Sequence, residues 1–173
     1  MLLILSTGYS GTKFVADQFG IDHEPRSKDY RYFWEFISGR RKTEPYVRQM
    51  FKGNERECNS NLLPLLDSIE KVFPDVNILH LVRHPKDTVR SLMSGTIFPD
   101  EPQRFEKCVD WWVDWHTRLD KYPLLRLEDF KGKPLNVKPK SFPPYEQWTS
   151  YQKKYFHSKC DKLIKKYYES NNR

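Results

Sequence analysis

The stretch LLILSTGYSGTKFVADQFG, residues 2–20, decides the expected fold of this chain. Residues 2–5 are a continuous apolar run, as in a strand buried on both faces of a parallel sheet. Phe14, Val15 and Phe19 then recur at helical spacing. The stretch therefore predicts a strand, a glycine turn and a helix, the unit from which α/β proteins with parallel sheets are built.

The turn between these two elements has the composition of an anion-binding loop. Gly8 and Gly11 allow positive φ angles and a close approach of the backbone to a ligand. The N–H groups at the helix start, with Thr12 and Lys13 beside them, form a cradle for a negative group. Ordinary strand-to-helix connections also contain glycine and threonine, so the turn alone leaves both interpretations open.

This turn differs from the loop that binds nucleoside triphosphates. The motif GxxxxGK[ST] has four residues between its glycines, whereas two residues separate Gly8 from Gly11. Lys13 is followed by Phe14, so the hydroxyl group that would bind Mg²⁺ is missing. The sequence favours a phosphate bound without a metal and disfavours an ATPase or a nucleotide kinase.

Composition limits the choice of partner. The 173 residues suit one domain, residues 1–173, because neither a linker nor an internal repeat divides them. Thirty Lys and Arg against 23 Asp and Glu give a net charge of +7, which favours an anionic partner. The charge alone leaves open nucleic acid, an acidic membrane surface and a phosphorylated small molecule. Because the lysines gather into no recognisable nucleic-acid-binding motif, we do not expect nucleic acid.

The lack of a recognisable targeting signal and the pattern of the cysteines predict a cytoplasmic protein. The apolar start, residues 1–5, is too short for a signal peptide, and no run approaches the ~20 residues of a membrane span. Cys58, Cys108 and Cys160 are odd in number and form no CxxC pair. We therefore expect reduced thiols rather than disulfides or zinc ligands, and no metal site.

A second stretch, residues 73–95, supplies another set of polar side chains. Residues 76–82 predict a buried strand that ends at Arg83, on the carboxyl edge where open α/β sheets bind ligands. Pro85 suits the first turn of a following helix. Ser91 falls opposite the apolar face of that helix, so we expect its hydroxyl to lie away from the core. That apolar face carries Val89, Leu92 and Met93.

The rest of the chain predicts further elements. Residues 62–72, 101–119 and 148–168 have helical apolar spacing. Residues 131–145 contain four prolines and predict a loop. Residues 29–51 are rich in aromatic and charged side chains, which either pack in the core or line a substrate pocket.

Four landmarks together resemble the sulfotransferases that use 3′-phosphoadenosine 5′-phosphosulfate (PAPS). Arg83-His84-Pro85 with Ser91 matches their RxPxxxxxS signature, and Ser10-Gly11-Thr12 resembles their 5′-phosphosulfate loop. Two further landmarks follow the family's order: Ile21-Asp22-His23-Glu24 and Arg126-Leu127-Glu128-Asp129-Phe130. The resemblance covers residues 2–130.

This resemblance implies a fold, a donor and a set of donor contacts. The fold would be a three-layer α/β sandwich with a short parallel sheet, the P-loop-NTPase-like sulfotransferase fold. Arg83 and Ser91 would hold the 3′-phosphate of PAPS, and of its product adenosine 3′,5′-bisphosphate. The residues expected around the 5′-phosphosulfate are Gly8, Tyr9, Ser10, Gly11, Thr12, Lys13 and Phe14.

Two departures from the family's pattern concern cations. Many members carry Lys or Arg directly before Ser-Gly-Thr, whereas this chain has Tyr9, which leaves Lys13 as the nearest replacement. The late basic loop that holds the 3′-phosphate in relatives is not recognisable. Residues 131–133 and 136–140 carry lysines that either replace it or are simply solvated.

Sulfuryl transfer also needs a base to take the acceptor's proton. His23 and Glu24, after the first helix, rank first, and Glu57 ranks second although it also suits the dipole of the following helix. Glu128 and Asp129 instead suggest capping and a salt bridge with Arg126.

The expected function is sulfuryl transfer from PAPS to a hydroxyl or amine of a small-molecule, glycan or lipid acceptor, with no metal. The alternatives are a nucleotide or nucleoside kinase-like P-loop phosphotransferase and a catalytically inactive protein that binds adenosine 3′,5′-bisphosphate.

Overall fold

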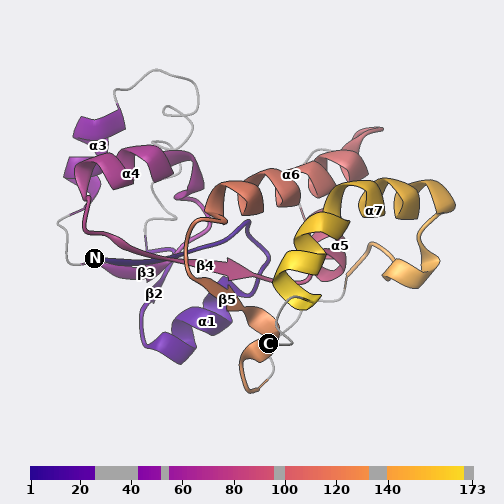
Figure 1. Ribbon diagram of the computed structural model, residues 1–173, viewed down its shortest axis with the longest axis horizontal. Helices are drawn as coiled ribbons and strands as arrows, with labels where there is room; N and C mark the ends of the chain where they lie inside the picture. Colours follow the sequence, from indigo (N-terminus) through magenta and orange to yellow (C-terminus); the bar gives the residue numbers. More distant parts are fainter. Residues whose placement is uncertain (26–42, 52–54, 96–99, 133–139, 170–173) are drawn as a thin grey trace.

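The computed structural model describes residues 1–25, 43–51, 55–95, 100–132 and 140–169. These residues contain a five-stranded sheet in which every pairing is parallel. The strand order is β2-β3-β1-β4-β5 (Figure 1). The strands are β1 (Leu2–Leu5), β2 (Asp22–His23), β3 (Arg56–Cys58), β4 (Asn77–Val82) and β5 (Leu124–Arg126). The predicted α/β class with a short parallel sheet is confirmed.

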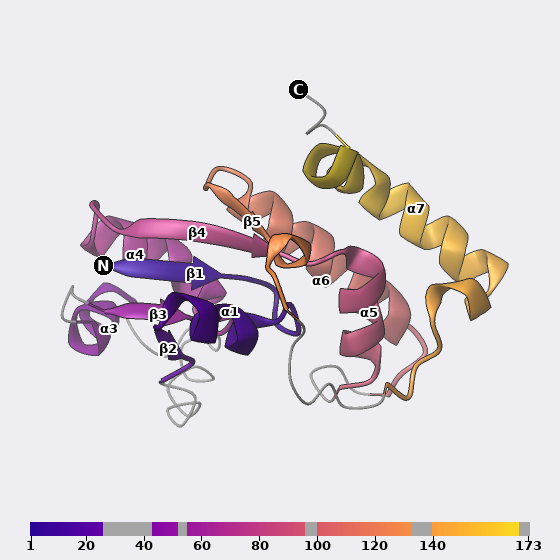
Figure 2. The ribbon, with the colours of Figure 1, turned by 90° about the horizontal axis from the view of Figure 1, so that it is seen from below.

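Helices lie on both faces of this sheet. Figures 1 and 2 show α1 (Thr12–Phe19) on one face and α3 (Thr43–Met50), α4 (Leu66–Val72) and α6 (Arg104–Leu119) on the other. Helix α5 (Pro85–Met93) follows β4 beyond its carboxyl end, and α7 (Ser150–Ile164) packs on α6. Shorter turns are the 3-10 segments Leu63–Leu65, Leu127–Asp129 and Tyr145–Gln147 and the π-helical turn Lys165–Glu169.

The central strand β1 is buried from both sides because its side chains alternate between two cores. Leu3 and Leu5 point into the core formed with α3, α4 and α6. Ile4 points into the opposite core, where it meets Val15 and Ala16 of α1. The predicted succession of buried strand, turn and helix is therefore confirmed.

A third core joins α5, α6 and α7. Trp112 of α6 is fully buried there with Val89 of α5 and Phe156 of α7. Helix α6 begins three residues later than predicted, and α7 begins at a capping box in which Thr149 and Gln152 exchange hydrogen bonds. The three cysteines are buried free thiols, as predicted.

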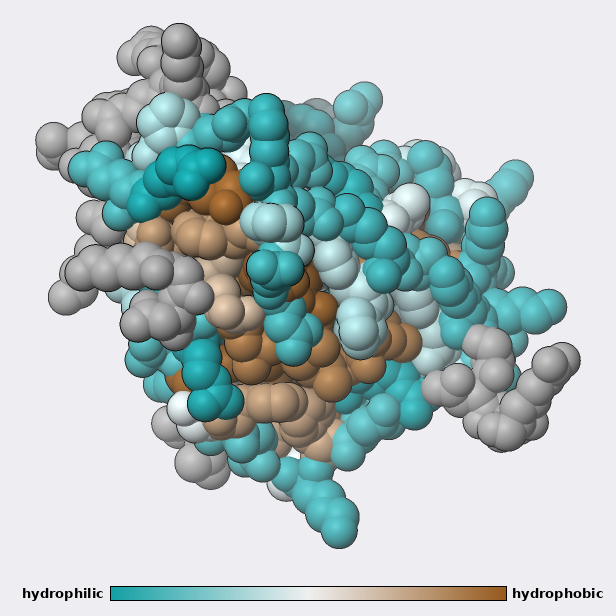
Figure 3. Space-filling model, turned by 60° about the vertical axis from the view of Figure 1, so that its left-hand side comes forward, coloured by the Kyte–Doolittle hydropathy of each residue, from teal (hydrophilic) through white to brown (hydrophobic). Residues whose placement is uncertain are grey.

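The sheet face that carries α1 is covered less completely than the other face. Among the described residues, α1 is the one α-helix that packs there, and Phe19, Leu79 and Leu125 are only partly buried around it. Leu124 on the edge strand β5 is 36% exposed. Figure 3 accordingly shows apolar side chains reaching the surface in a band across the middle of the molecule.

Candidate functional site

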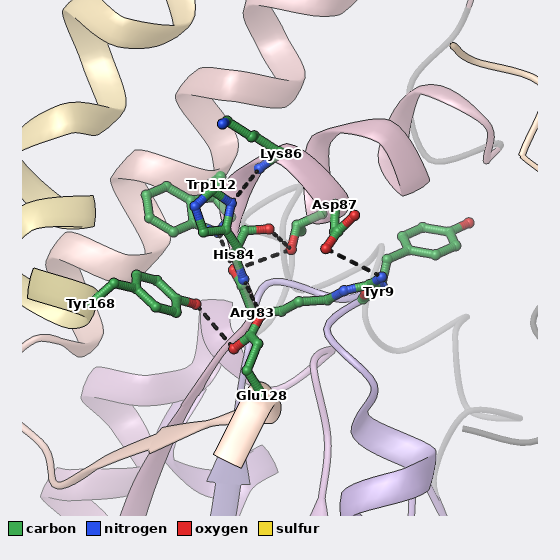
Figure 4. Close-up of polar contacts among 9 residues, drawn as sticks. Tyr9, Arg83, His84, Lys86, Asp87, Trp112, Glu128 and Tyr168 are labelled. Carbon is green, nitrogen blue, oxygen red and sulfur yellow. Dashed lines mark hydrogen bonds and ion pairs between the residues drawn. The ribbon is translucent and has the colours of Figure 1, made fainter. Parts of the chain in front are cut away.

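The strand order creates a crevice at the carboxyl ends of β1 and β4. The chain leaves β1 towards β2 on one side of the sheet, whereas it leaves β4 towards β5 on the other side. Adjacent parallel strands whose connections diverge in this way leave an opening between them, and open α/β sheets bind ligands there. The turn after β1 and Arg83 after β4 both lie at this opening (Figure 4).

The turn after β1 is held in an unusual backbone conformation. Gly8, Tyr9 and Gly11 have φ angles of 79°, 53° and 79°. The Ser10 hydroxyl lies inside the turn, 3.2 Å from the carbonyl oxygen of Gly8 and 3.2 Å from the Thr7 hydroxyl. Ser10 is fully buried, so its hydroxyl helps to fix the shape of the turn from the inside.

The backbone N–H groups of residues 10–14 make no hydrogen bond with any described residue. The first intrahelical bond of α1 runs from the N–H of Val15 to the carbonyl oxygen of Gly11. Gly11 is the N-cap of α1 and offers no capping side chain. Consecutive unpaired donors at a helix start favour a bound anion, in line with the predicted cradle.

Gly11 should tolerate no side chain. A Cβ atom there would lie 2.7 Å from Leu127 Cδ1, and its φ of 79° disfavours any L-residue. We expect Gly11→Ala to lower the free energy of unfolding by about 2–3 kcal/mol in urea titrations. Gly20→Ala is the matched control, since its φ is 59° with open space around it, and should cost about 1 kcal/mol. Equal losses would show that the Leu127 contact is unimportant.

Arg83 connects the two halves of the site. Its Nη1 atom donates to the carbonyl oxygen of Tyr9 at 3.2 Å, and its Nη2 atom lies 3.9 Å from an Asp87 carboxylate oxygen (Figure 4). Its own carbonyl oxygen accepts from the indole of Trp112 at 3.3 Å. The guanidinium is therefore fixed beside the turn, yet 25% of the side chain remains exposed.

Two further cations join Arg83. Burial lowers the pKa of Lys140, and the positive charges of Arg83 and Arg90 lower it further. Lys140 Nζ also lies 5.9 Å from the centre of the Tyr9 ring. Arg90 is held by a 3.0 Å bond from its Nε to the carbonyl oxygen of Phe142. Arg83, Arg90 and Lys140 thus gather three positive charges, a distribution that favours an anion.

The expectation that the Ser91 hydroxyl lies away from the core is wrong. Ser91 is 1% exposed, and its Oγ has no hydrogen-bond partner. Helix α5 is covered on a second side, where Phe142 bonds to both Arg90 and Ser94. A periodicity argument misses this cover because residue 142 is remote in sequence. An unpaired buried hydroxyl costs free energy.

His84, directly after Arg83, is held at the start of α5 by several hydrogen bonds. The His84 side chain caps α5 by accepting from the N–H of Lys86 at 3.3 Å, and burial with the nearby Lys86 charge lowers its pKa. Glu128 accepts from the His84 N–H at 2.8 Å and from the Tyr168 hydroxyl at 3.3 Å (Figure 4). Asp129 pairs with Arg126 at 2.7 Å, as predicted. Glu128 and Asp129 are therefore structural.

His23 is the base candidate that lies against the turn. Its Nε2 atom is 3.0 Å from the Thr12 hydroxyl, and the residue is otherwise exposed at the end of β2. Lys13 is also exposed, one residue beyond Thr12. The imidazole of His23 therefore combines a contact with the start of α1 with exposure to solvent.

The two carboxylate candidates have other surroundings. Glu24 has a φ of 44°, and its Oε1 accepts from the Ser60 hydroxyl at 2.6 Å. Glu57 lies within β3 rather than ahead of a helix, and it is 1% exposed. His23 is therefore more accessible from solvent than Glu57.

Part of the predicted site lies outside the described residues. These residues are most of the aromatic stretch, 26–42, and much of the basic loop, 133–139. Lys131 is exposed, whereas Lys140 lies beside Arg83. Sequence reasoning missed Arg90, because nothing in its local spacing distinguishes it from a solvated helical arginine.

In the described ranges, no helix has both the length and the apolar character that crossing a bilayer requires. The same ranges contain no cluster of three His, Cys, Asp or Glu side chains arranged for a metal ion. No protein-family model matches this sequence, and no curated protein matches it.

Proposed function

We propose that this chain is a PAPS-dependent sulfotransferase with the P-loop-NTPase-like sulfotransferase fold. One observation carries the proposal: two separate anion sites meet at the β1–β4 crevice. The unpaired N–H groups of residues 10–14 form one, and Arg83, Arg90 and Lys140 form the other. A donor with a 5′-phosphosulfate and a separate 3′-phosphate matches this pair of sites.

The proposed reaction forms a bond from an acceptor oxygen or nitrogen to sulfur as the bond from sulfur to the bridging oxygen breaks. The electron pair stays on the departing 5′-phosphate, where the turn's N–H groups and Lys13 would stabilise it. Arg83 and its neighbouring cations would hold the 3′-phosphate, and this remote binding energy would orient the reacting end. The acceptor's proton would pass to a base, for which His23 is the best-positioned candidate.

Two other functions use the same crevice. A kinase-like phosphotransferase would need Mg²⁺ near the turn, where Phe14 replaces the usual hydroxyl residue. The second is an inactive protein that binds adenosine 3′,5′-bisphosphate. It would explain why Tyr9 stands where many sulfotransferases carry a Lys or Arg. Tyr9 is 36% exposed and packs its hydroxyl towards Gly95, so it supplies a ring rather than a charge at the crevice.

A thermal-shift comparison tests the donor assignment. We expect adenosine 3′,5′-bisphosphate to raise the melting temperature in the presence of EDTA. Its two phosphates would bind the two proposed anion sites of the folded protein, and a ligand that binds only the folded state stabilises it. ATP with Mg²⁺ should raise it far less, and short oligonucleotides should have no comparable effect. Equal stabilisation by ATP with Mg²⁺ would instead identify a kinase-like protein.

Arg83→Ala should weaken binding of adenosine 3′,5′-bisphosphate by about 1.5–3 kcal/mol, the usual contribution of a charged hydrogen bond. Ser91→Ala should weaken it less, because only a neutral hydroxyl is lost. Arg48→Ala, at an exposed position of α3, removes the same charge away from the crevice and should leave the affinity unchanged. Calorimetry that finds parental affinity in both crevice variants would refute the 3′-phosphate site.

A further inference from the structure

The peptide unit that joins Arg83 to His84 is held on both of its sides. Its carbonyl oxygen, which belongs to Arg83, accepts from the indole N–H of Trp112 at 3.3 Å. Its N–H group, which belongs to His84, donates to Glu128 Oε1 at 2.8 Å (Figure 4). Because a peptide unit is planar, bonds on its two opposite sides leave it little freedom to rotate. The backbone from which the Arg83 side chain projects therefore has a fixed orientation.

Tyr168, in the π-helical turn Lys165–Glu169, anchors the Glu128 carboxylate. Its hydroxyl donates to Glu128 Oε2 at 3.3 Å, whereas His84 uses the other oxygen, Oε1. Burial and the negative charge of Glu128 raise the pKa of Tyr168, so its hydroxyl stays protonated and donates. A carboxylate with both oxygens bonded can rotate only by breaking a bond. The N–H side of the peptide unit is therefore held through Tyr168.

Tyr167, the preceding residue of the π-helical turn, packs against the group on the carbonyl side. It is 2% exposed, and the centre of its ring lies 6.5 Å from that of Trp112. Its hydroxyl donates to the carbonyl oxygen of His116, one turn after Trp112 on α6, at 3.1 Å. The π-helical turn therefore contacts both groups that hold the peptide unit, and turns of this rare kind are frequent at functional sites.

We propose that Tyr168 and Glu128 are positioning residues for Arg83, and that through them the π-helical turn sets the affinity of the 3′-phosphate site. The guanidinium of Arg83 must stay beside the glycine turn after β1, where its Nη1 atom donates to the carbonyl oxygen of Tyr9. A binding side chain keeps such a position only when the groups behind it are fixed. The inference rests on the proposed function, because the bound 3′-phosphate reports where Arg83 lies.

Calorimetry with two nucleotides tests this role. Adenosine 3′,5′-bisphosphate carries the 3′-phosphate and adenosine 5′-monophosphate lacks it, so the ratio of the two affinities measures the 3′-phosphate contact. We expect Tyr168→Phe to lower this ratio about threefold and Glu128→Ala to lower it about tenfold, with parental affinity for the monophosphate. Removal of a negative charge by itself would tighten the binding of an anion. A lower ratio in Glu128→Ala therefore separates positioning from electrostatics.

Tyr155→Phe is the matched control, because it removes the same kind of bond away from Arg83. The Tyr155 hydroxyl of α7 donates to an Asp110 carboxylate oxygen of α6 at 2.8 Å. This variant should lower the free energy of unfolding in urea titrations and leave the affinity ratio unchanged. A purely structural role of Tyr168 would give the same result as this control.

A double-mutant cycle identifies the residue through which Glu128 acts. In an Arg83→Ala background, Glu128→Ala should no longer change the affinity ratio, because its effect passes through Arg83. A parental ratio in Tyr168→Phe, a parental or raised ratio in Glu128→Ala, or an undiminished effect of Glu128→Ala without Arg83 overturns the inference and leaves the proposed function standing. Failure of the parental protein to bind the bisphosphate would instead refute the proposed function, and the inference with it.

Discussion

Replacing His23 by alanine is expected to lower sulfuryl transfer by about 10²–10⁴-fold, the usual contribution of a general base. His23 contacts the Thr12 hydroxyl at the edge of the cradle and is open to solvent, so it can take a proton from an acceptor. Affinity for adenosine 3′,5′-bisphosphate should barely change, because the acceptor side faces away from the phosphates. The measurement is transfer of labelled sulfate from PAPS to an acceptor found by screening hydroxyl and amine compounds.

Variants of the neighbouring residues separate this role from others. Lys13→Ala should lose both turnover and donor affinity, because Lys13 would contact the leaving phosphate. Full activity in both His23→Ala and Glu24→Ala would contradict the assignment and leave Glu57 as the remaining candidate. Loss of bisphosphate binding in His23→Ala would indicate that His23 only holds Thr12 in place.

The second large effect concerns a buried pair of histidines. His80 of β4 and His116 of α6 are fully buried, with His80 Nε2 and His116 Nδ1 2.6 Å apart. Their other ring nitrogens have no partner. Burial lowers the pKa of His80 to about 4 and lowers that of His116 well below its usual value. Both rings are therefore neutral in the folded state, since one must donate and the other accept.

The folded protein should lose stability as the pH falls below about 6.5. Between pH 6.5 and about 4 the unfolded chain binds a proton at His80, whereas the folded chain does not. The free energy of unfolding should fall by about 1.4 kcal/mol per pH unit for each such histidine, and by about 3 kcal/mol in total for His80. Above pH 6.5 the full contribution is present.

Urea unfolding at several pH values measures this slope. The groups near the pair are Asp120, Lys166 and Tyr167. Burial tends to raise the pKa of Asp120. The hydrogen bonds that Asp120 accepts from Lys166 and Tyr167 nevertheless hold its pKa below the usual value. Asp120 therefore contributes to the slope only in stronger acid. His80→Gln should reduce the slope between pH 6.5 and 4.5 without abolishing it, because the pKa values of His116 and His84 are also lowered, whereas His157→Gln, at an exposed histidine, should leave it unchanged. A parental protein with no slope in this window would contradict the prediction.

Local sequence determined the strands β1 and β4, the turn and most helices of this protein. Residues 2–20 form β1, the turn and α1 because a short apolar run, two glycines and a 3.6-residue period act over neighbouring residues. The same holds for β4 and α5, where the run ends at Arg83 and Pro85 begins the helix. The polar ends of both strands were predictable for this reason, and so was their place at the carboxyl edge of a parallel sheet.

Only the tertiary structure decided which of these side chains meet. Ser91 is buried although it lies opposite the predicted apolar face of α5, and Lys140 lies close enough to Arg83 and Arg90 for their charges to lower its pKa. His80 and His116, 36 residues apart, form a pair that no local pattern indicates. Periodicity reports which face of an element is apolar, but the charge and burial of a polar group depend on segments remote in sequence that pack against it. The crevice was therefore predictable from the sequence, whereas its third cation and its buried hydroxyl required the fold.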